Sequence, residues 1–154
     1  ESFNLLRQKI RNRHTAPFID DFVVKPEYLS RVLPLVTKII KKYEGFIFTI
    51  AGHVGDGNFH IIPLVDIADP NVRKNIPVIA KEVYDLVHEY NGSITGEHND
   101  GLVRTPYLRQ MYGEKIISLF EQTKNIFDPH NIFNPRKKVF GDLDYAMNHI
   151  RQNW

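Results

Sequence analysis

The stretch from Ala51 to His60, AGHVGDGNFH, decides the fold because it joins two apolar runs through a glycine-rich reversal. Asp-Gly between apolar runs is a strong signal for a β-hairpin, since a two-residue type I′ turn needs positive φ at both positions. With Asp56 and Gly57 as the turn, His53 is predicted to lie directly opposite His60. Directly opposed residues share a face of the sheet, with Cβ atoms about 4.5–5.5 Å apart. The hairpin therefore predicts two imidazoles close enough to bind one metal ion.

Outward from this hairpin, the spacing of apolar residues and the positions of glycine and proline predict alternating helices and strands. A helix is expected to start at Pro26 and to be stopped by Gly45, and a second long helix is expected to run from Pro70 to near Asn91-Gly92. Further helices are expected over residues 3–13, 106–112, 113–126 and 142–151, and strands over residues 19–24, 46–51, 59–65 and 93–95. This order predicts an α+β fold, in which helices pack on one face of a mainly antiparallel sheet. We expect a single domain over residues 1–154.

The bulk composition is that of an ordinary globular chain of 154 residues and 18.0 kDa with a net charge of +2. Apart from the short cluster Arg136-Lys137-Lys138, the basic residues are scattered along the chain. This scatter argues against nucleic acid as a partner. The absence of cysteine excludes disulfides and thiolate metal sites within this chain. No apolar run approaches the ~20 residues that span a bilayer. Because the chain begins with Glu1, we expect it to be an excerpt of a longer protein. We expect this protein to lie in the cytoplasm or peripherally at the inner membrane.

A second motif, Gly96-Glu97-His98-Asn99-Asp100-Gly101, places a carboxylate beside an imidazole between two glycines. Taken alone it is more typical of a plain turn with an exposed Glu-His pair. Together with the hairpin, Glu97 supplies the third ligand of a site formed with His53 and His60. Two imidazoles and a carboxylate suit Zn²⁺, Fe²⁺ or Mn²⁺ and leave positions open for substrate. His98 is then the candidate general base, because imidazole exchanges protons near neutral pH. The remaining histidines lack such a context: His14, His88, His130 and His149.

Three strings, in order and at similar spacing, resemble the C-terminal part of the FAD-linked oxidases, the group of glycolate oxidase, D-lactate dehydrogenase and D-2-hydroxyglutarate dehydrogenase. They are residues 52–60, Gly96-Glu97-His98, and the tail from Phe127-Asp128-Pro129 to Asn134-Pro135-Arg136-Lys137. The resemblance covers residues 46–140, and residues 1–45 more weakly. It implies a ferredoxin-like cap domain that binds substrate and metal, whereas a separate domain of the same protein binds FAD.

The resemblance also implies roles for particular residues. His53, His60 and Glu97 would bind a divalent metal, and His98 would act as the base toward a 2-hydroxy acid whose hydride passes to FAD. Arg7 is a candidate for the substrate carboxylate, with an exposed helical arginine as the alternative. Asn134 and Lys137 are candidates for contact with the cofactor, although a solvated lysine fits equally well. An electron-acceptor protein or a quinone would be a further partner.

The sequence also departs from the family pattern. Asn99-Asp100-Gly101 stands where many relatives carry Gly-Ile-Gly, Ile62 stands where many carry asparagine, and Asp20 lies near the place of a substrate-binding lysine. The particular substrate is therefore not transferred. Two other functions fit the residues: a metal-dependent hydrolase, in which a His₂-Glu site activates water, and a non-catalytic interaction domain stabilised by metal.

Overall fold

The computed structural model describes residues 13–151, which divide between two compact units. Of these residues, 13–96 and 151 belong to the first unit, and 97–150 belong to the second. The helix expected over residues 3–13 lies outside the described residues, apart from Arg13, which is not helical. Arg7 also lies outside them.

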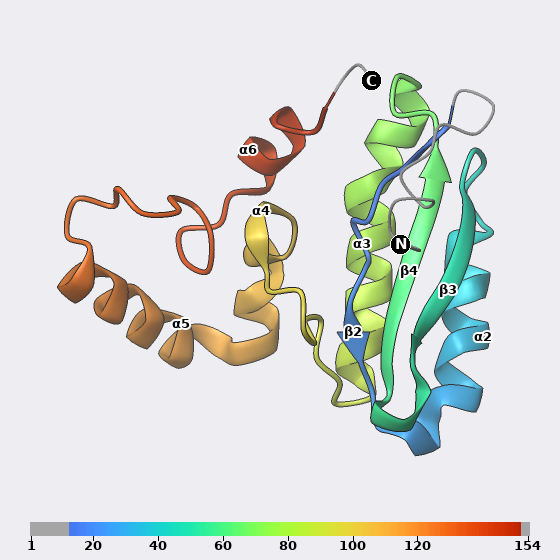
Figure 1. The fold of residues 1–154 in the computed structure, drawn as a ribbon, viewed down its shortest axis with the longest axis horizontal. Helices are drawn as coiled ribbons and strands as arrows, with labels where there is room; N and C mark the ends of the chain where they lie inside the picture. The colour runs from blue at the N-terminus through green and yellow to red at the C-terminus, as the bar shows by residue number, and fades with distance from the viewer. Residues whose placement is uncertain (1–12, 152–154) are drawn as a thin grey trace. The chain divides into compact units, whose positions relative to one another are not determined.

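In the first unit, strand β4 (Asn58–Val65) is the centre of an antiparallel sheet (Figure 1). Strand β3 (Ile47–His53) pairs with it along almost its whole length. The short strands β1 (His14–Thr15) and β2 (Phe22–Val23) pair with opposite ends of β4. The predicted antiparallel sheet is thus confirmed, and strands β3 and β4 form the hairpin that carries His53 and His60.

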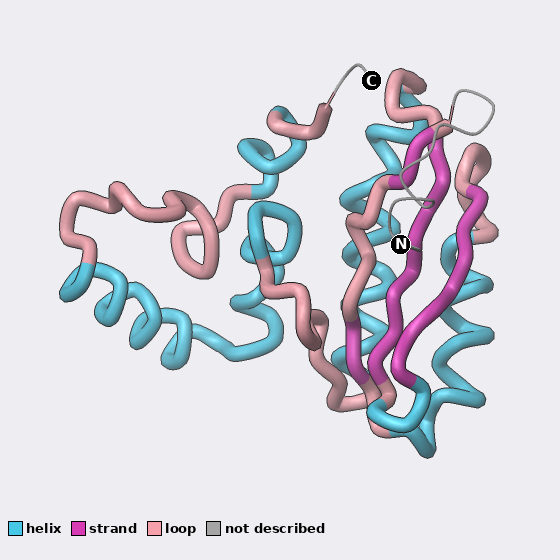
Figure 2. Tube along the Cα trace, in the orientation of Figure 1, coloured by secondary structure: helices cyan, strands magenta, loops and turns pink. Residues whose placement is uncertain are grey.

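Two helices, α2 (Leu29–Ile40) and α3 (Pro70–Glu89), pack against this sheet and against each other (Figure 1; Figure 2). A short 3₁₀ turn at Pro26–Tyr28 leads into α2, and the Asp69 carboxylate accepts the Asn71 N–H at 2.8 Å to cap α3. Both helices bury most of their apolar side chains, as their periodicity predicts. The fully buried ones include Val32, Val36, Ile40, Ile79, Val83 and Val87.

Strand β2 is shorter than the expected strand over residues 19–24. Asp21 has a φ of +72°, a left-handed backbone conformation that ends regular pairing, so only Phe22–Val23 remain in the strand. Ile19 and Phe22 on either side are fully buried. The two acidic residues Asp20 and Asp21 therefore lie in a buried bend rather than in an extended strand.

The second unit contains helix α4 (Gly101–Arg104), a 3₁₀ turn (Thr105–Tyr107), helix α5 (Leu108–Phe127) and helix α6 (Leu143–Asn148). Gly113, with a φ of +73°, interrupts α5 near its start, which agrees with the two helical stretches expected on either side of this glycine. None of the helices within residues 13–151 is long and apolar enough to cross a membrane.

After α5 the chain is organised by the Asp128 carboxylate. It accepts the backbone N–H groups of Ile132 and Phe133, both at 2.9 Å, and forms an ion pair with Lys124. The hydrogen bond from Lys124 contributes most to lowering the pKa of Asp128, from 3.8 to about 2, and the two backbone N–H groups add to it. The ionised carboxylate thus holds the turn that leads from α5 into the tail.

Replacing Asp128 by asparagine is expected to lower the free energy of unfolding at neutral pH and to have less effect as the pH falls from 3.8 to about 2. Because the folded-state pKa lies below the ordinary value, the carboxylate stabilises the fold above that value, and this contribution disappears as it becomes protonated. Urea unfolding of both proteins over a pH series measures the difference. A difference that stayed constant across this range would contradict the assignment.

Candidate functional site

The β3–β4 hairpin has a different register from the one predicted. His53 pairs with Asn58 and Ala51 pairs with His60, so the expected direct pairing of His53 with His60 is wrong. The turn is a longer one, in which Val54–Asp56 form a 3₁₀ turn and only Gly57 adopts positive φ, at +68°.

A contact with β2 explains this longer turn. The Gly57 carbonyl accepts the Val24 N–H at 3.0 Å, and a Cβ on Gly57 would lie 1.8 Å from the Val24 carbonyl oxygen. The glycine is therefore required by a close approach between two backbones as well as by its own φ.

The two histidines nevertheless meet, because the register differs from the predicted one by two residues. Side chains alternate between the faces of a sheet with period two, so a shift of two residues leaves each on its original face. His53 and His60 become diagonal neighbours, with ring centroids 5.6 Å apart and ring planes at 88°. Ligand nitrogens of the two rings lie within 4.8 Å of each other. The two imidazoles thus lie close together, as predicted, but as diagonal neighbours and not as directly opposed residues.

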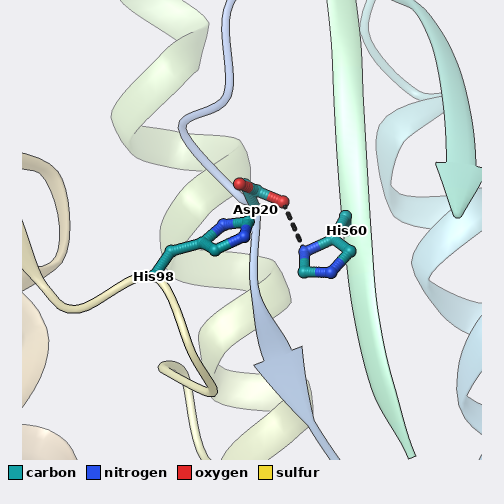
Figure 3. Close-up of side chains that lie close together, drawn as sticks. All are labelled: Asp20, His60 and His98. Atoms are coloured by element: carbon teal, nitrogen blue, oxygen red, sulfur yellow. Dashed lines mark hydrogen bonds and ion pairs between the residues drawn. The ribbon is translucent and has the colours of Figure 1, made fainter. Parts of the chain in front are cut away.

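A buried carboxylate holds one of these rings. Asp20 Oδ1 lies 3.0 Å from His60 Nδ1, and both residues are only 8% exposed (Figure 3). With Asp20 ionised, Nδ1 carries the hydrogen and Nε2 keeps its lone pair for a ligand. Histidines that bind metals usually donate their other ring N–H to a carboxylate in this way, which fixes the tautomer and the ring orientation.

The neighbouring carboxylate, Asp21, serves a different set of partners. It is fully buried and accepts a hydrogen bond from Asn58 Nδ2 at 3.0 Å through Oδ1. Its Oδ2 accepts the backbone N–H of Gly96 at 2.9 Å. Asp21 therefore links strand β4 to the residue that directly precedes Glu97.

Glu97 and His98 are the first two residues of the second unit. Within this unit, His98 Nε2 lies 3.5 Å from Glu97 Oε1, and their side chains are 30% and 51% exposed, respectively. Covalent continuity ties both to Gly96. The carboxylate and the imidazole of the second motif are thus close neighbours, as the alternative of a simple Glu-His pair also predicted.

The tail residues proposed for cofactor contact are brought together in one turn of the second unit. The Lys137 N–H donates to the Asn134 carbonyl at 3.2 Å, and Asn134 has a φ of +48°. Asn134 is exposed and Lys137 is half-buried. The geometry shows a local turn, and the cofactor role remains a prediction.

Sequence reasoning assigned no function to Asp20, Asp21 or Asn58. A signal was present, because two adjacent acids between Ile19 and Phe22 are unusual in a strand that is otherwise apolar. Buried carboxylates need partners, and here those partners are a site histidine and the chain next to a site glutamate.

Residues 1–138 match the family described as FAD linked oxidases, C-terminal domain. The chain belongs to this family. Its FAD-linked oxidase relatives include a D-2-hydroxyglutarate dehydrogenase of Pantoea ananatis, 33% identical over 121 residues, or 79% of this chain and 12% of that protein.

Two further relatives of this FAD-linked oxidase domain are shorter proteins. Glycolate oxidase subunit GlcD of Bacillus subtilis is 32% identical over 80% of this chain and 26% of its own length. A D-lactate dehydrogenase of Anaerostipes hadrus is 33% identical over 76% of this chain and 25% of its own length. The chain therefore spans between about an eighth and about a quarter of these relatives.

Proposed function

We propose that this chain is the substrate-binding cap of a FAD-dependent oxidoreductase that oxidises a 2-hydroxy acid. The observation that carries the proposal is the paired His53 and His60, with His60 oriented by Asp20, in a domain of the FAD-linked oxidase family. The names of the relatives, which include D-lactate and D-2-hydroxyglutarate dehydrogenases, support a substrate of this class.

In this proposal His53, His60 and Glu97 bind one divalent metal ion. Two imidazole nitrogens within 4.8 Å, one of them on a ring supported by a carboxylate, form a donor set that fits Zn²⁺, Mn²⁺ or Fe²⁺. When bound, such an ion polarises the oxygens of the substrate as a Lewis acid. The three protein ligands leave coordination positions for the hydroxyl and carboxylate of a 2-hydroxy acid.

His98 is proposed to accept the proton of the C2 hydroxyl as the alcohol becomes a 2-oxo acid. FAD, which another domain of the same protein would hold, would supply the acceptor for the hydride of C2. Arg7 would bind the substrate carboxylate, and Asn134 and Lys137 would contact the cofactor. A protein or quinone acceptor would then reoxidise the flavin.

Metal content tests the hairpin part of this proposal. We expect the purified chain to retain about one equivalent of zinc, manganese or iron, and the double variant His53→Ala/His60→Ala to lose it because two of three ligands are gone. His88→Ala is the matched control, since His88 is exposed on α3. Elemental analysis gives the metal content, and circular dichroism checks the fold. Equal metal in the double variant would refute the ligand assignment.

The role of His98 is tested in the full-length flavoenzyme. His98→Ala is expected to lower turnover by about 10²–10⁴-fold, the usual contribution of a general base, while the metal content changes little. His130→Ala, another exposed histidine of the second unit, is the control. Steady-state kinetics with D-lactate, glycolate and D-2-hydroxyglutarate give the comparison. Unchanged turnover in His98→Ala would remove this residue from the role of base.

A further inference from the structure

We propose that Asp21 is a positioning residue of this site: its buried carboxylate fixes Gly96 and so sets the direction from which Glu97 approaches the metal. This inference rests on the proposed metal site. Asp21 itself is not a ligand in the proposal. It acts through the backbone of the residue next to one.

The contacts of Asp21 carry the inference. Its side chain is fully buried, and its two oxygens accept hydrogen bonds from different parts of the first unit, Asn58 Nδ2 at 3.0 Å and the Gly96 N–H at 2.9 Å. Hydrogen bonds to an ionised carboxylate are stronger than those between neutral groups. Asn58 is held in turn, because its Nδ2 also donates to the Phe22 carbonyl at 3.3 Å.

The backbone conformation at Asp21 allows two consecutive carboxylates to bind different partners. Asp20 bonds to His60 on β4, whereas Asp21 bonds to Gly96, the residue before Glu97. The positive φ of Asp21, +72°, interrupts the strand between these two roles. Left-handed backbone is uncommon for residues with a side chain, although aspartate and asparagine tolerate it better than most.

Gly96 lies so close to this pair that an added side chain would displace one of them. A Cβ on Gly96 would be 2.5 Å from Asn58 Nδ2, 2.7 Å from Asp21 Oδ1 and 3.0 Å from Val23 Cγ2. Three residues earlier, Ser93 and Val23 exchange two backbone hydrogen bonds of 2.8 Å. The segment from Ser93 to Gly96, which directly precedes Glu97 in the chain, is thus held at both ends.

A purely structural role for Asp21 makes a different prediction from a positioning role. If Asp21 only supports the fold, its loss lowers stability, and its effect on metal affinity does not depend on Glu97. If Asp21 positions Glu97, its loss weakens metal binding only while Glu97 is a ligand. A double-mutant cycle between the two residues separates these cases.

The experiment measures binding of Co²⁺ alone to the chain, by visible absorption, in the parent, Asp21→Gly, Glu97→Gln and the double variant. Glycine removes the carboxylate and accepts the positive φ. We expect Asp21→Gly to weaken Co²⁺ binding by about 10–100-fold, the usual cost of losing a group that supports a metal ligand. In the Glu97→Gln background the same change should have almost no further effect.

Two further variants guard against a trivial loss of folding. Asp21→Asn should recover part of the affinity, because the new amide oxygen can accept the Gly96 N–H although the hydrogen bond from Asn58 Nδ2 is lost. Gly96→Ala should weaken binding as Asp21→Gly does. Gly55→Ala, in the hairpin, is the matched control for Gly96→Ala, because a Cβ on Gly55 would have no neighbour within 4 Å.

Hydrogen exchange of the Gly96 amide in the metal-free chain reports the Asp21 contact separately, and it should become faster in Asp21→Gly. Additive losses in the cycle, or full Co²⁺ affinity in Asp21→Gly, would overturn the inference while leaving the metal site intact. If the parent chain bound no Co²⁺, the proposed metal site would be wrong and the positioning role would fall with it.

Discussion

Strand β4 is paired along both of its edges, and this double pairing sets the position of each candidate site residue of the first unit. On one edge, β3 places His53 diagonally across from His60. On the other edge, β2 pairs with the start of β4, so the bend that carries Asp20 and Asp21 lies beside His60 and Asn58. A slip of one residue in the β3–β4 pairing would place His53 and His60 on opposite faces of the sheet.

The fold was largely predictable because its local signals agree. Apolar periodicity predicts helices α2 and α3, and Asp69-Pro70 marks the start of α3. The two apolar runs around residues 51–60 predict strands β3 and β4. The hairpin register was not predictable from Asp56-Gly57 alone, because Gly57 is fixed by a contact with Val24, more than thirty residues earlier in the chain. The histidine pair was still predicted correctly, since a two-residue shift preserves the face.

The supporting carboxylates could not be assigned from sequence for a related reason. Asp21 reaches partners 37 and 75 residues away through its side chain, and its φ is positive. The sequence alone predicted the candidate metal ligands. The carboxylates that orient them could not be predicted, because their contacts form only when the sheet assembles. Membership of the FAD-linked oxidase family favours an oxidoreductase over the hydrolase that the same ligand types would also allow.

X-ray absorption at the zinc edge of the zinc-loaded chain tests most directly the proposal that the hairpin histidines bind a metal ion. We expect two imidazole ligands and at least one carboxylate oxygen, at about 2.0–2.2 Å from the zinc. A spectrum dominated by oxygen, with no outer-shell scattering from imidazole rings, would contradict it, because the zinc would then be bound away from His53 and His60.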